Sequence, residues 1–313
     1  MRLLLLGCTG LVGRELVPTL LEAGHQLSVV SRRPQTSLPW AKDLELHWVQ
    51  ADPAQVSSWE QGGDLHQALA GAEGVVNLAG EPIAEQRWTP AHRQLLHESR
   101  IATTKHLTAA MAALPTPPAV LVNASAVGFY GTSEDAAFVE SSAAGQDVLG
   151  TLCTNWEAAA AVRPETTRLV VVRIGIVLAA DGGALGKMLP VFRAGFGGPI
   201  GSGRQWMSWI HRTDLCALIS QALTDSSWQG AVNGVAPQPV SMASFASTLG
   251  RCLGRPSLLP VPGPVLHLLL GDGARVVLDG QQVRSERLPQ LGFSFRYPEL
   301  PEALAAATTT RSR

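Results

Sequence analysis

A glycine-rich segment near the start of the chain has the spacing and the neighbours of a phosphate-binding loop. Its three glycines follow the pattern G-x-x-G-x-x-G, between an apolar run at residues 3–6 and a segment with helically spaced leucines. Such glycines permit a tight turn and close approach of the backbone to a pyrophosphate, and the helix N-terminus offers N–H groups to phosphate oxygens. We therefore predict a dinucleotide site, although an ordinary strand–helix turn also uses glycine. The expected contacts are Gly7, Thr9, Gly10, Leu11, Val12 and Gly13.

The residues after the second predicted strand select between the two common dinucleotides. An NAD site usually has a carboxylate here, which holds the 2′-hydroxyl of the ribose. This chain has Ser31, Arg32 and Arg33 instead. Hydroxyl and guanidinium groups suit a 2′-phosphate, because arginine presents fixed donors to phosphate oxygens. We therefore predict NADP(H) rather than NAD(H), with Ser31 and Arg32 as contacts; the alternative is a solvated basic loop.

A parallel sheet is needed to position these residues, and the sequence alternates strand and helix patterns as such a sheet requires. The run at residues 3–6 is continuously apolar, as expected for a strand covered on both faces. The alternation favours an α/β fold, a Rossmann-type doubly wound parallel sheet with a smaller C-terminal substrate lobe. Strands are expected at 3–6, 27–30, 44–49, 75–78, 120–124 and 169–174, and helices near 11–24, 65–69, 90–113, 150–162, 214–224 and 240–253.

The pattern changes after residue 175, which suggests two domains. We expect residues 1–175 to form the NADP(H)-binding domain and residues 176–313 to form mainly the substrate lobe, with some strands and helices interleaved with the first domain. The glycine-rich stretch at 182–203 indicates a flexible loop or lid beside the site. Ser241 is the expected N-cap of the helix that follows it.

Composition and charge exclude several classes of protein. Of the 313 residues, 46% are hydrophobic and 16% are charged, which is typical of a globular chain with a large core. The net charge of −1 gives no indication of nucleic-acid binding. The apolar stretches at 1–6 and 261–270 are too short for a signal peptide or a membrane span. The four cysteines are widely spaced, which predicts reduced thiols, a cytoplasmic location and no metal site.

Further motifs are distributed along almost the whole chain. They are 7–13, Ser31-Arg32, Asn77-Leu78-Ala79-Gly80-Glu81-Pro82-Ile83, 87–89, 99–104, 124–131, Trp156-Glu157, 173–178, 197–203, 209–214, 233–237 and Gly292-Phe293. In this combination the chain resembles the short-chain dehydrogenase/reductase superfamily in its extended form, which is similar to nucleotide-sugar epimerases and dehydratases. More narrowly, it resembles the atypical branch called epimerase family proteins, which occurs in bacteria and higher eukaryotes.

This resemblance implies roles for five more residues. Leu78, Ala79 and Gly80 match the stretch that passes the cofactor after the fourth strand, where glycine permits close approach. Arg100 matches a position on the following helix that reaches the cofactor. Ser125 matches the serine that binds the substrate carbonyl in this superfamily. A plain strand end, a surface arginine and an N-cap serine are the alternative interpretations.

The helix after Ser125 departs from the family pattern. The usual mechanism needs a Tyr-x-x-x-Lys pair, in which the tyrosine moves the proton and the lysine lowers its pKa and binds the ribose. By spacing, Cys153 occupies the tyrosine position and Glu157 the lysine position. A carboxylate cannot lower the pKa of a neighbour, but it can accept hydrogen bonds from ribose hydroxyls. We therefore predict Glu157 as a cofactor contact; the alternative is a solvated helix carboxylate.

Two other residues are candidates for the missing proton donor. Tyr130 follows Ser125 closely in the chain and is our second predicted catalytic residue, with an aromatic wedge in a glycine-containing loop as the alternative. His211 is a further candidate, for which a buried structural role near Asp214 is the favoured interpretation.

The function that these residues predict is an NADP(H)-dependent epimerase or oxidoreductase acting on a small polar molecule, with sugar derivatives as one class. The alternative is a non-catalytic NADP(H)-binding sensor or regulator, because the catalytic pair is missing while the glycine loop is intact. We expect no nucleic-acid or membrane partner, and a homodimer is compatible with both functions.

Overall fold

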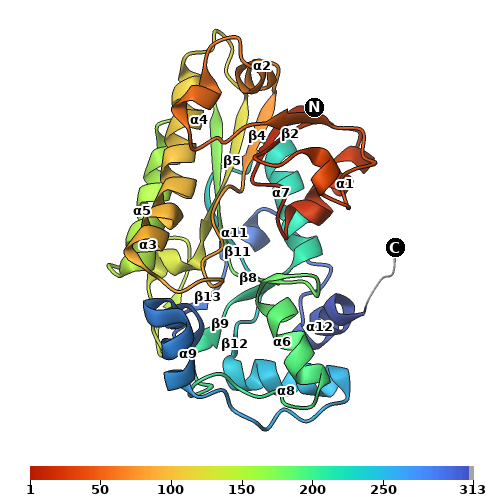
Figure 1. Ribbon diagram of the computed structural model, residues 1–313, viewed down its shortest axis with the longest axis vertical. Coiled ribbons are helices and arrows are strands. Elements are labelled where there is room, and N and C mark those ends of the chain that lie inside the picture. The colour runs from red at the N-terminus through yellow and green to blue at the C-terminus, as the bar shows by residue number, and fades with distance from the viewer. Residues whose placement is uncertain (310–313) are drawn as a thin grey trace.

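A seven-stranded sheet forms the centre of the computed structural model, which describes residues 1–309 (Figure 1). All its neighbouring strands pair in parallel. Their order is β11-β7-β5-β4-β1-β2-β3, so the direction in which strands are added reverses between β1 and β4. This confirms the predicted Rossmann-type sheet. The strands are β1 (Arg2–Leu6), β2 (Gln26–Ser31), β3 (His47–Gln50), β4 (Gly74–Asn77), β5 (Val120–Ala126), β7 (Arg168–Ile174) and β11 (Gly230–Gly234).

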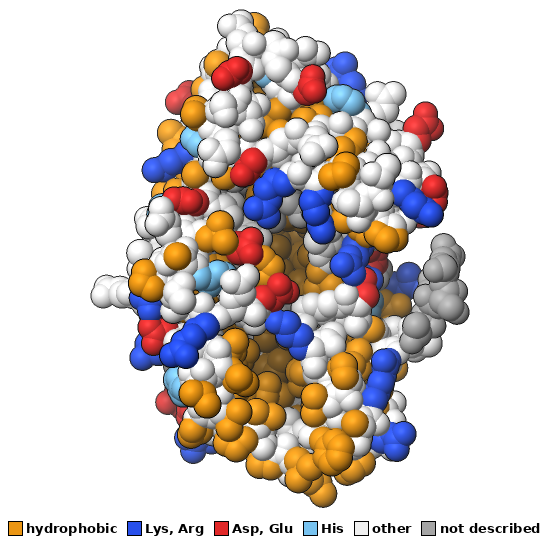
Figure 2. All heavy atoms as spheres, in the orientation of Figure 1, with side chains coloured by type: hydrophobic (Ala, Val, Ile, Leu, Met, Phe, Trp, Pro, Cys, Tyr) orange, Lys and Arg blue, Asp and Glu red, His pale blue; other side chains and the backbone are white. Residues whose placement is uncertain are grey.

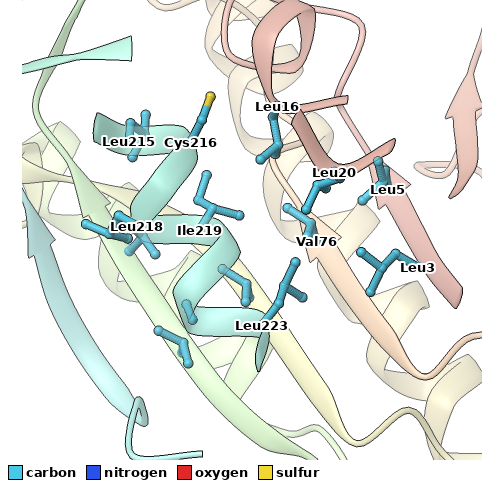
Figure 3. Close-up of a cluster of buried hydrophobic side chains, with 14 of the residues drawn as sticks. Leu3, Leu5, Leu16, Leu20, Val76, Leu215, Cys216, Leu218, Ile219 and Leu223 are labelled. Carbon is cyan, nitrogen blue, oxygen red and sulfur yellow. The ribbon is translucent and has the colours of Figure 1, made fainter. Parts of the chain in front are cut away.

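Helices cover both faces of this sheet (Figure 1). They are α1 (Gly13–Glu22) and α7 (Arg212–Thr224) on one face, and α2 (Asp64–Ala70), α4 (Thr103–Ala112) and α5 (Val148–Ala161) on the other. The continuous leucines of β1 serve both faces, because successive side chains of a strand point in opposite directions. Leu3 and Leu5 belong to the cluster with α1 and α7 (Figure 3), whereas Leu4 and Leu6 belong to the cluster with α2 and α4.

The segment before α4 forms a single helical run with a local irregularity. It begins with α3 (Pro90–His97), continues through a π-helical turn (Glu98–Ala102) and passes into α4. Thr89 caps its start, since its hydroxyl accepts a hydrogen bond from the backbone N–H of His92. Turns of the π type often occur at functional sites. This one contains Arg100, and it sets the position of that side chain.

A smaller lobe lies below the sheet in Figure 1 and has its own hydrophobic cluster. That cluster is built largely from α6 (Gly183–Arg193), α8 (Met242–Leu253) and α12 (Leu300–Thr308). The remaining helices are α9 (Gly263–Leu270), α10 (Arg275–Leu278) and α11 (Arg287–Gln290), with short 3₁₀ turns at Gln35–Ser37, Val56–Trp59, Val127–Tyr130 and Gly271–Ala274. The short strands are β6 (Ala137–Phe138), β8 (Ile176–Leu178), β9 (Trp206–Met207), β10 (Trp209–His211), β12 (Val240–Ser241) and β13 (Gln282–Val283).

Three expectations about the elements are wrong. The stretch at 182–203 is not wholly a loop, because α6 occupies its first half and buries Leu185, Leu189 and Phe192. The seventh strand, β11, was not expected, yet it pairs with β7 in the central sheet. The third strand begins at His47 instead of residue 44.

Other expectations about the second half hold or fall outside the described residues. The N-cap role of Ser241 is confirmed, because its side chain accepts from the N–H of Ser244. Within residues 1–309, the helices are too short or too polar to cross a lipid bilayer. Residues 310–313, the end of the predicted 176–313 domain, lie outside the described residues.

Candidate functional site

The glycine loop joins β1 to α1, and its three glycines have different surroundings. Gly7 has a φ of +71°, and a Cβ there would lie 2.4 Å from the backbone nitrogen of Ala79. A Cβ at Gly13 would lie 1.7 Å from the carbonyl oxygen of Cys8. At Gly10 it would meet only the carbonyl oxygen of Gly7, at 3.9 Å. Gly7 and Gly13 therefore allow backbone segments to pack closely, while Gly10 leaves open space on the outer side of the loop.

The backbone of this loop offers donors to an anion. Within residues 1–309, the N–H groups of residues 9–12 donate no hydrogen bond to another backbone group. They lie at the N-terminus of α1, where the helix dipole is positive. Arg212 supports the loop from α7, donating from Nη1 to the carbonyl oxygen of Leu11 at 3.3 Å. An open glycine, free N–H groups and a helix N-terminus together fit the pyrophosphate of a dinucleotide.

The end of β2 lies beside this loop, since β2 pairs with β1. Ser31 is buried, and its Oγ accepts a hydrogen bond from the backbone N–H of Arg33 at 3.1 Å. The side chains of Arg32 and Arg33 are exposed. Nη2 of Arg32 lies 3.9 Å from a carboxylate oxygen of Glu81, and the side chain of Arg32 is 65% exposed whereas that of Glu81 is 19% exposed. Both guanidinium groups therefore add positive charge to this edge, and that of Arg32 is partly balanced by Glu81.

Arg100 reaches from the π-helical turn to the end of β4. Its Nη2 donates to the carbonyl oxygen of Glu81 at 2.8 Å, and its Nη1 donates to that of Leu96 at 3.1 Å. A Cβ at Gly80 would lie 3.0 Å from the guanidinium, so glycine there permits the approach. The guanidinium also lies 5.3 Å from the ring centre of Trp156, and burial lowers its pKa from the usual value. Arg100 is therefore a charged wall of the site with part of its donor set committed.

A cavity of about 350 Å³ opens beside these residues. Figure 2 shows a hollow between the sheet domain and the lobe, with hydrophobic side chains in its walls. Ser125 and Cys153 line it from the sheet domain, and Trp206 and Val276 line it from the lobe. Doubly wound sheets bind ligands outside the carboxyl ends of their strands, near the point where strand order reverses. The cavity has that location, so it is the candidate substrate site.

Ser125 is linked to two ionised side chains. Its Oγ donates to Oε1 of Glu157 at 2.7 Å. The same carboxylate accepts two hydrogen bonds of 2.9 Å from Arg173, one from Nε and one from Nη2. The exposed fractions of the two side chains are 7% for Arg173 and 15% for Glu157, so the ion pair is largely buried. Glu157 is thus already engaged, and its contact with a cofactor ribose stays a prediction.

Arg173 is the residue of this site that the sequence analysis did not single out. It is the penultimate residue of β7, directly after the apolar run LVVV, and its position is buried. Such a residue in a strand of a buried sheet needs a charged partner. The available signal was therefore this cation after an apolar run, together with a carboxylate at the lysine position of the family pattern.

Tyr130 is bound by Arg173 through a different nitrogen from those that bind Glu157. Nη1 of Arg173 donates to Oη of Tyr130 at 2.9 Å, and Tyr130 donates to Oδ1 of Asn233 at 2.7 Å. Burial raises the pKa of Tyr130. Burial also opposes the charge of Arg173, but the hydrogen bonds that Arg173 donates to Glu157 and Tyr130 raise its pKa overall. Among the described residues that line the cavity, Tyr130 does not appear. Its catalytic role stays a prediction, which this placement disfavours.

Cys153 and His211 differ in their relation to the cavity. Cys153 lines it, and burial raises the pKa of its thiol to about 11, so the group is neutral at pH 7. His211 is the N-cap of α7, with Nδ1 accepting from the N–H of Thr213 at 3.2 Å. Burial lowers the pKa of His211 to about 4. The structure therefore supports the structural interpretation of His211.

Family models and known proteins match most of this chain. A family model described as "NAD dependent epimerase/dehydratase family" matches residues 3–233, and one described as "Domain of unknown function (DUF1731)" matches residues 261–307. "Epimerase family protein SDR39U1 homolog, chloroplastic" of Arabidopsis thaliana is 43% identical over 305 residues, covering 96% of this chain and 84% of that protein. "Epimerase family protein SDR39U1" of Homo sapiens is 38% identical over 308 residues, covering 97% and 98%.

Solved structures agree with these matches. The crystal structure of human epimerase family protein SDR39U1 (isoform 2) with NADPH has a TM-score of 0.86 and 36% identity, and covers 98% of this chain and 99% of that one. The UDP-glucuronic acid 4-epimerase from Bacillus cereus, in complex with UDP-glucuronic acid and NAD, has a TM-score of 0.77 at 16% identity, with 98% of both chains covered, and shares the fold. The resemblance predicted from the motifs is confirmed: this chain belongs to the NAD-dependent epimerase/dehydratase family.

Proposed function

We propose that this protein binds NADPH along the carboxyl edge of its sheet and acts as an NADP(H)-dependent oxidoreductase or epimerase on a small molecule in the adjoining cavity. The observation that carries the proposal is the glycine loop, with open space at Gly10 and unpaired N–H groups at residues 9–12 within the described chain. The human relative crystallised with NADPH supports it, because that structure matches 98% of this chain.

Each part of the cofactor has suitable residues along this edge. The pyrophosphate suits the loop N–H groups and the N-terminus of α1. A 2′-phosphate suits Ser31 and Arg32, since a guanidinium binds phosphate oxygens with fixed donors. Leu78, Ala79 and Gly80 would pass beneath the cofactor, and Arg100 and Glu157 would flank the ribose next to the cavity. When bound there, the nicotinamide would supply or accept a hydride.

Ser125 is the proposed catalytic residue, because it is the hydroxyl of β5 that lines the cavity. Its hydrogen bond to Glu157 leaves the oxygen lone pairs for a substrate hydroxyl, and rotation about Cβ–Oγ would let it donate to a substrate carbonyl instead. Arg173 holds the carboxylate of Glu157 in place. It therefore fixes the acceptor that the Ser125 hydroxyl must release before it can donate to a substrate carbonyl. These residues would orient the reacting carbon toward the cofactor side of the cavity.

A titration of purified protein with NADPH and NADH, followed by ligand fluorescence, tests the cofactor proposal. We expect NADPH to bind at least about tenfold more tightly, and Arg32→Ala to reduce that preference while leaving NADH affinity unchanged. Arg2→Ala is the matched control, because Arg2 is an exposed arginine at the opposite end of β1. Tighter binding of NADH by the unchanged protein would overturn the choice of NADPH.

Turnover separates catalysis from a sensor role. NADPH absorbance and product stereochemistry would be followed with a panel of carbonyl compounds and nucleotide sugars. Turnover that is lost in Ser125→Ala supports an enzyme. Tight NADPH binding without turnover of any compound would favour the sensor.

We also propose a reducing compartment, with the cytoplasm as the first choice, because all four cysteines are free. The Arabidopsis relative is named chloroplastic. Cell fractionation with an antibody to this protein would decide between the two locations.

A further inference from the structure

We infer that the cavity takes a compact, mostly apolar carbonyl compound, or the alcohol formed from it, and not a nucleotide-diphosphate sugar. This substrate class rests on the proposed function, because it concerns the same cavity and the same cofactor. In the reducing direction, hydride from NADPH adds to the carbonyl carbon as the C=O π bond breaks, and a proton from solvent adds to the oxygen. The products are the alcohol and NADP⁺.

The first argument is the wall that α5 contributes. Leu149, Leu152, Cys153 and Trp156 all line the cavity, and their spacing of i, i+3, i+4 and i+7 places them on one face of the helix. Both leucines are only partly buried, so they present apolar surface to the hollow visible in Figure 2. Apolar surface of this kind favours a ligand that loses contact with water when it binds.

The opposite wall is apolar as well. Ile176 and Val276 line it, together with the indole of Trp206. The only polar atom of that indole, Nε1, donates to the carbonyl oxygen of Glu134 at 2.7 Å, so its ring surface is what remains for a ligand. A flat or branched apolar molecule can therefore contact both walls.

The polar side chains that line the cavity fall into two groups. Ser125, Ser208 and Arg100 are hydrogen-bonded to the protein, whereas Thr132, Arg275, Asp279 and Gln281 have no side-chain hydrogen bond within the described residues and are exposed or only partly buried. Ser208 donates to the carbonyl oxygen of Gln281 at 2.8 Å, and Ser125 donates to Glu157. Arg100 donates to two backbone carbonyl groups. A site built for a sugar would need free partners for several hydroxyl groups, since an unpaired polar group in a pocket costs affinity. Beside these committed groups, the cavity instead suits a ligand with one polar reacting group.

The charge and the volume of the cavity also favour a compact ligand without a diphosphate. The arginine and aspartate side chains that line the cavity are Arg100, Arg275, Asp147 and Asp279, two of each type. A diphosphate is favoured by an excess of positive side chains or by free N–H groups at a helix N-terminus, and the side chains of this cavity provide no such excess of charge. The volume of about 350 Å³ is near the lower end of ligand pockets, and the nicotinamide ring must share it.

The test compares two probes, acetophenone and UDP-glucose, on the full chain with and without saturating NADPH, using ligand-detected NMR and calorimetry. We expect acetophenone to bind the NADPH-loaded protein and UDP-glucose not to bind. Leu149→Asp should weaken acetophenone binding by about tenfold or more, because it places a charge in the apolar wall. Val148→Asp is the matched control, since Val148 is the adjacent residue, is 53% exposed and does not line the cavity.

The outcomes separate this inference from the proposed function. Absence of NADPH binding would overturn the proposed function. Tighter binding of UDP-glucose than of acetophenone, binding of neither probe, or an equal effect of the Leu149 and Val148 substitutions would overturn the apolar substrate class. The NADPH affinity and the melting temperature of each variant show whether that variant is folded. If Leu149→Asp does not fold, Leu152→Asn is a second variant of the same wall.

Discussion

The guanidinium of Arg173 holds the carboxylate of Glu157 through two hydrogen bonds of 2.9 Å. Glu157 stands where the family pattern has a lysine, so Arg173 brings a positive charge to this part of the site from a different element, β7. The pair is largely buried, and removal of one partner leaves the other charge without compensation. We therefore expect Arg173→Ala to lower the free energy of unfolding by about 3 kcal/mol, as measured by urea denaturation.

An exposed ion pair provides the control for this prediction. Arg2 lies 3.8 Å from Glu73, with side chains that are 62% and 50% exposed. Arg2→Ala should therefore change the free energy of unfolding by less than about 1 kcal/mol. Equal losses in the two variants would contradict the importance given to the buried pair. Arg173→Lys should be intermediate, because an ammonium group cannot make the two parallel hydrogen bonds.

Two glycines of the same loop should respond differently to alanine. Gly13→Ala places a Cβ 1.7 Å from the carbonyl oxygen of Cys8, so α1 must move and the free energy of unfolding should fall by about 2 kcal/mol. Gly10→Ala adds a methyl group to open space, so stability should be retained while NADPH affinity falls by about tenfold. Thermal melting and NADPH titration of both variants measure this. Unchanged NADPH affinity in Gly10→Ala would argue against a phosphate at this position.

Much of the fold could be predicted because local patterns determine it. The leucines of β1 form a continuous apolar run, and the structure buries them on both faces of the sheet. By contrast, β11 has the sequence GAVNG, which is short and has glycine at both ends, so no strand pattern stands out. Likewise, the glycines around α6 concealed the spacing of Leu185, Leu189 and Phe192 that folds it into a helix. Tertiary packing decides such segments.

The functional site likewise contains residues that a local sequence pattern indicates and residues that only the fold brings together. The glycine loop is contiguous in sequence, so its composition alone indicated a phosphate site. The network of Tyr130, Asn233, Glu157 and Arg173 joins segments that are far apart in the chain, with Tyr130 and Asn233 separated by 103 positions. The pairing of β7 with β11 places Asn233 opposite Arg173, while Tyr130 comes from the 3₁₀ turn after β5 and Glu157 from α5. The sequence could therefore identify Tyr130 as chemically interesting without indicating that its hydroxyl is already bonded.

The four thiols should differ sharply in reactivity toward a disulfide reagent at pH 8. Cys8, Cys153 and Cys216 are buried, and burial raises the pKa of Cys8 to about 12 and that of Cys153 to about 11. The reactive species is the thiolate, which is scarce at such pKa values. Cys252 is exposed, so it should react first in the folded protein. Loss of the fast phase in Cys252→Ser is the expected check, whereas a persistent fast phase would place a reactive thiol elsewhere.

His211 should make stability depend on pH below neutrality. It is 7% exposed, and burial lowers its pKa to about 4, with further lowering by Arg212 and Arg296 and an opposing effect of Glu15. Because the usual pKa is 6.5, the unfolded chain binds the proton first as pH falls. Its contribution to stability is therefore complete above pH 6.5 and is lost as pH falls toward 4, by about 3 kcal/mol.

His211→Asn tests this dependence, because asparagine keeps an N-cap acceptor but does not titrate. The free energy of unfolding, measured by urea denaturation between pH 4 and 7, should fall less steeply in the variant than in the unchanged protein. His97→Gln is the control, since His97 is an exposed histidine in the last turn of α3. If the pH dependence of His211→Asn matched that of the unchanged protein, the histidine would not be held neutral by its burial at the start of α7.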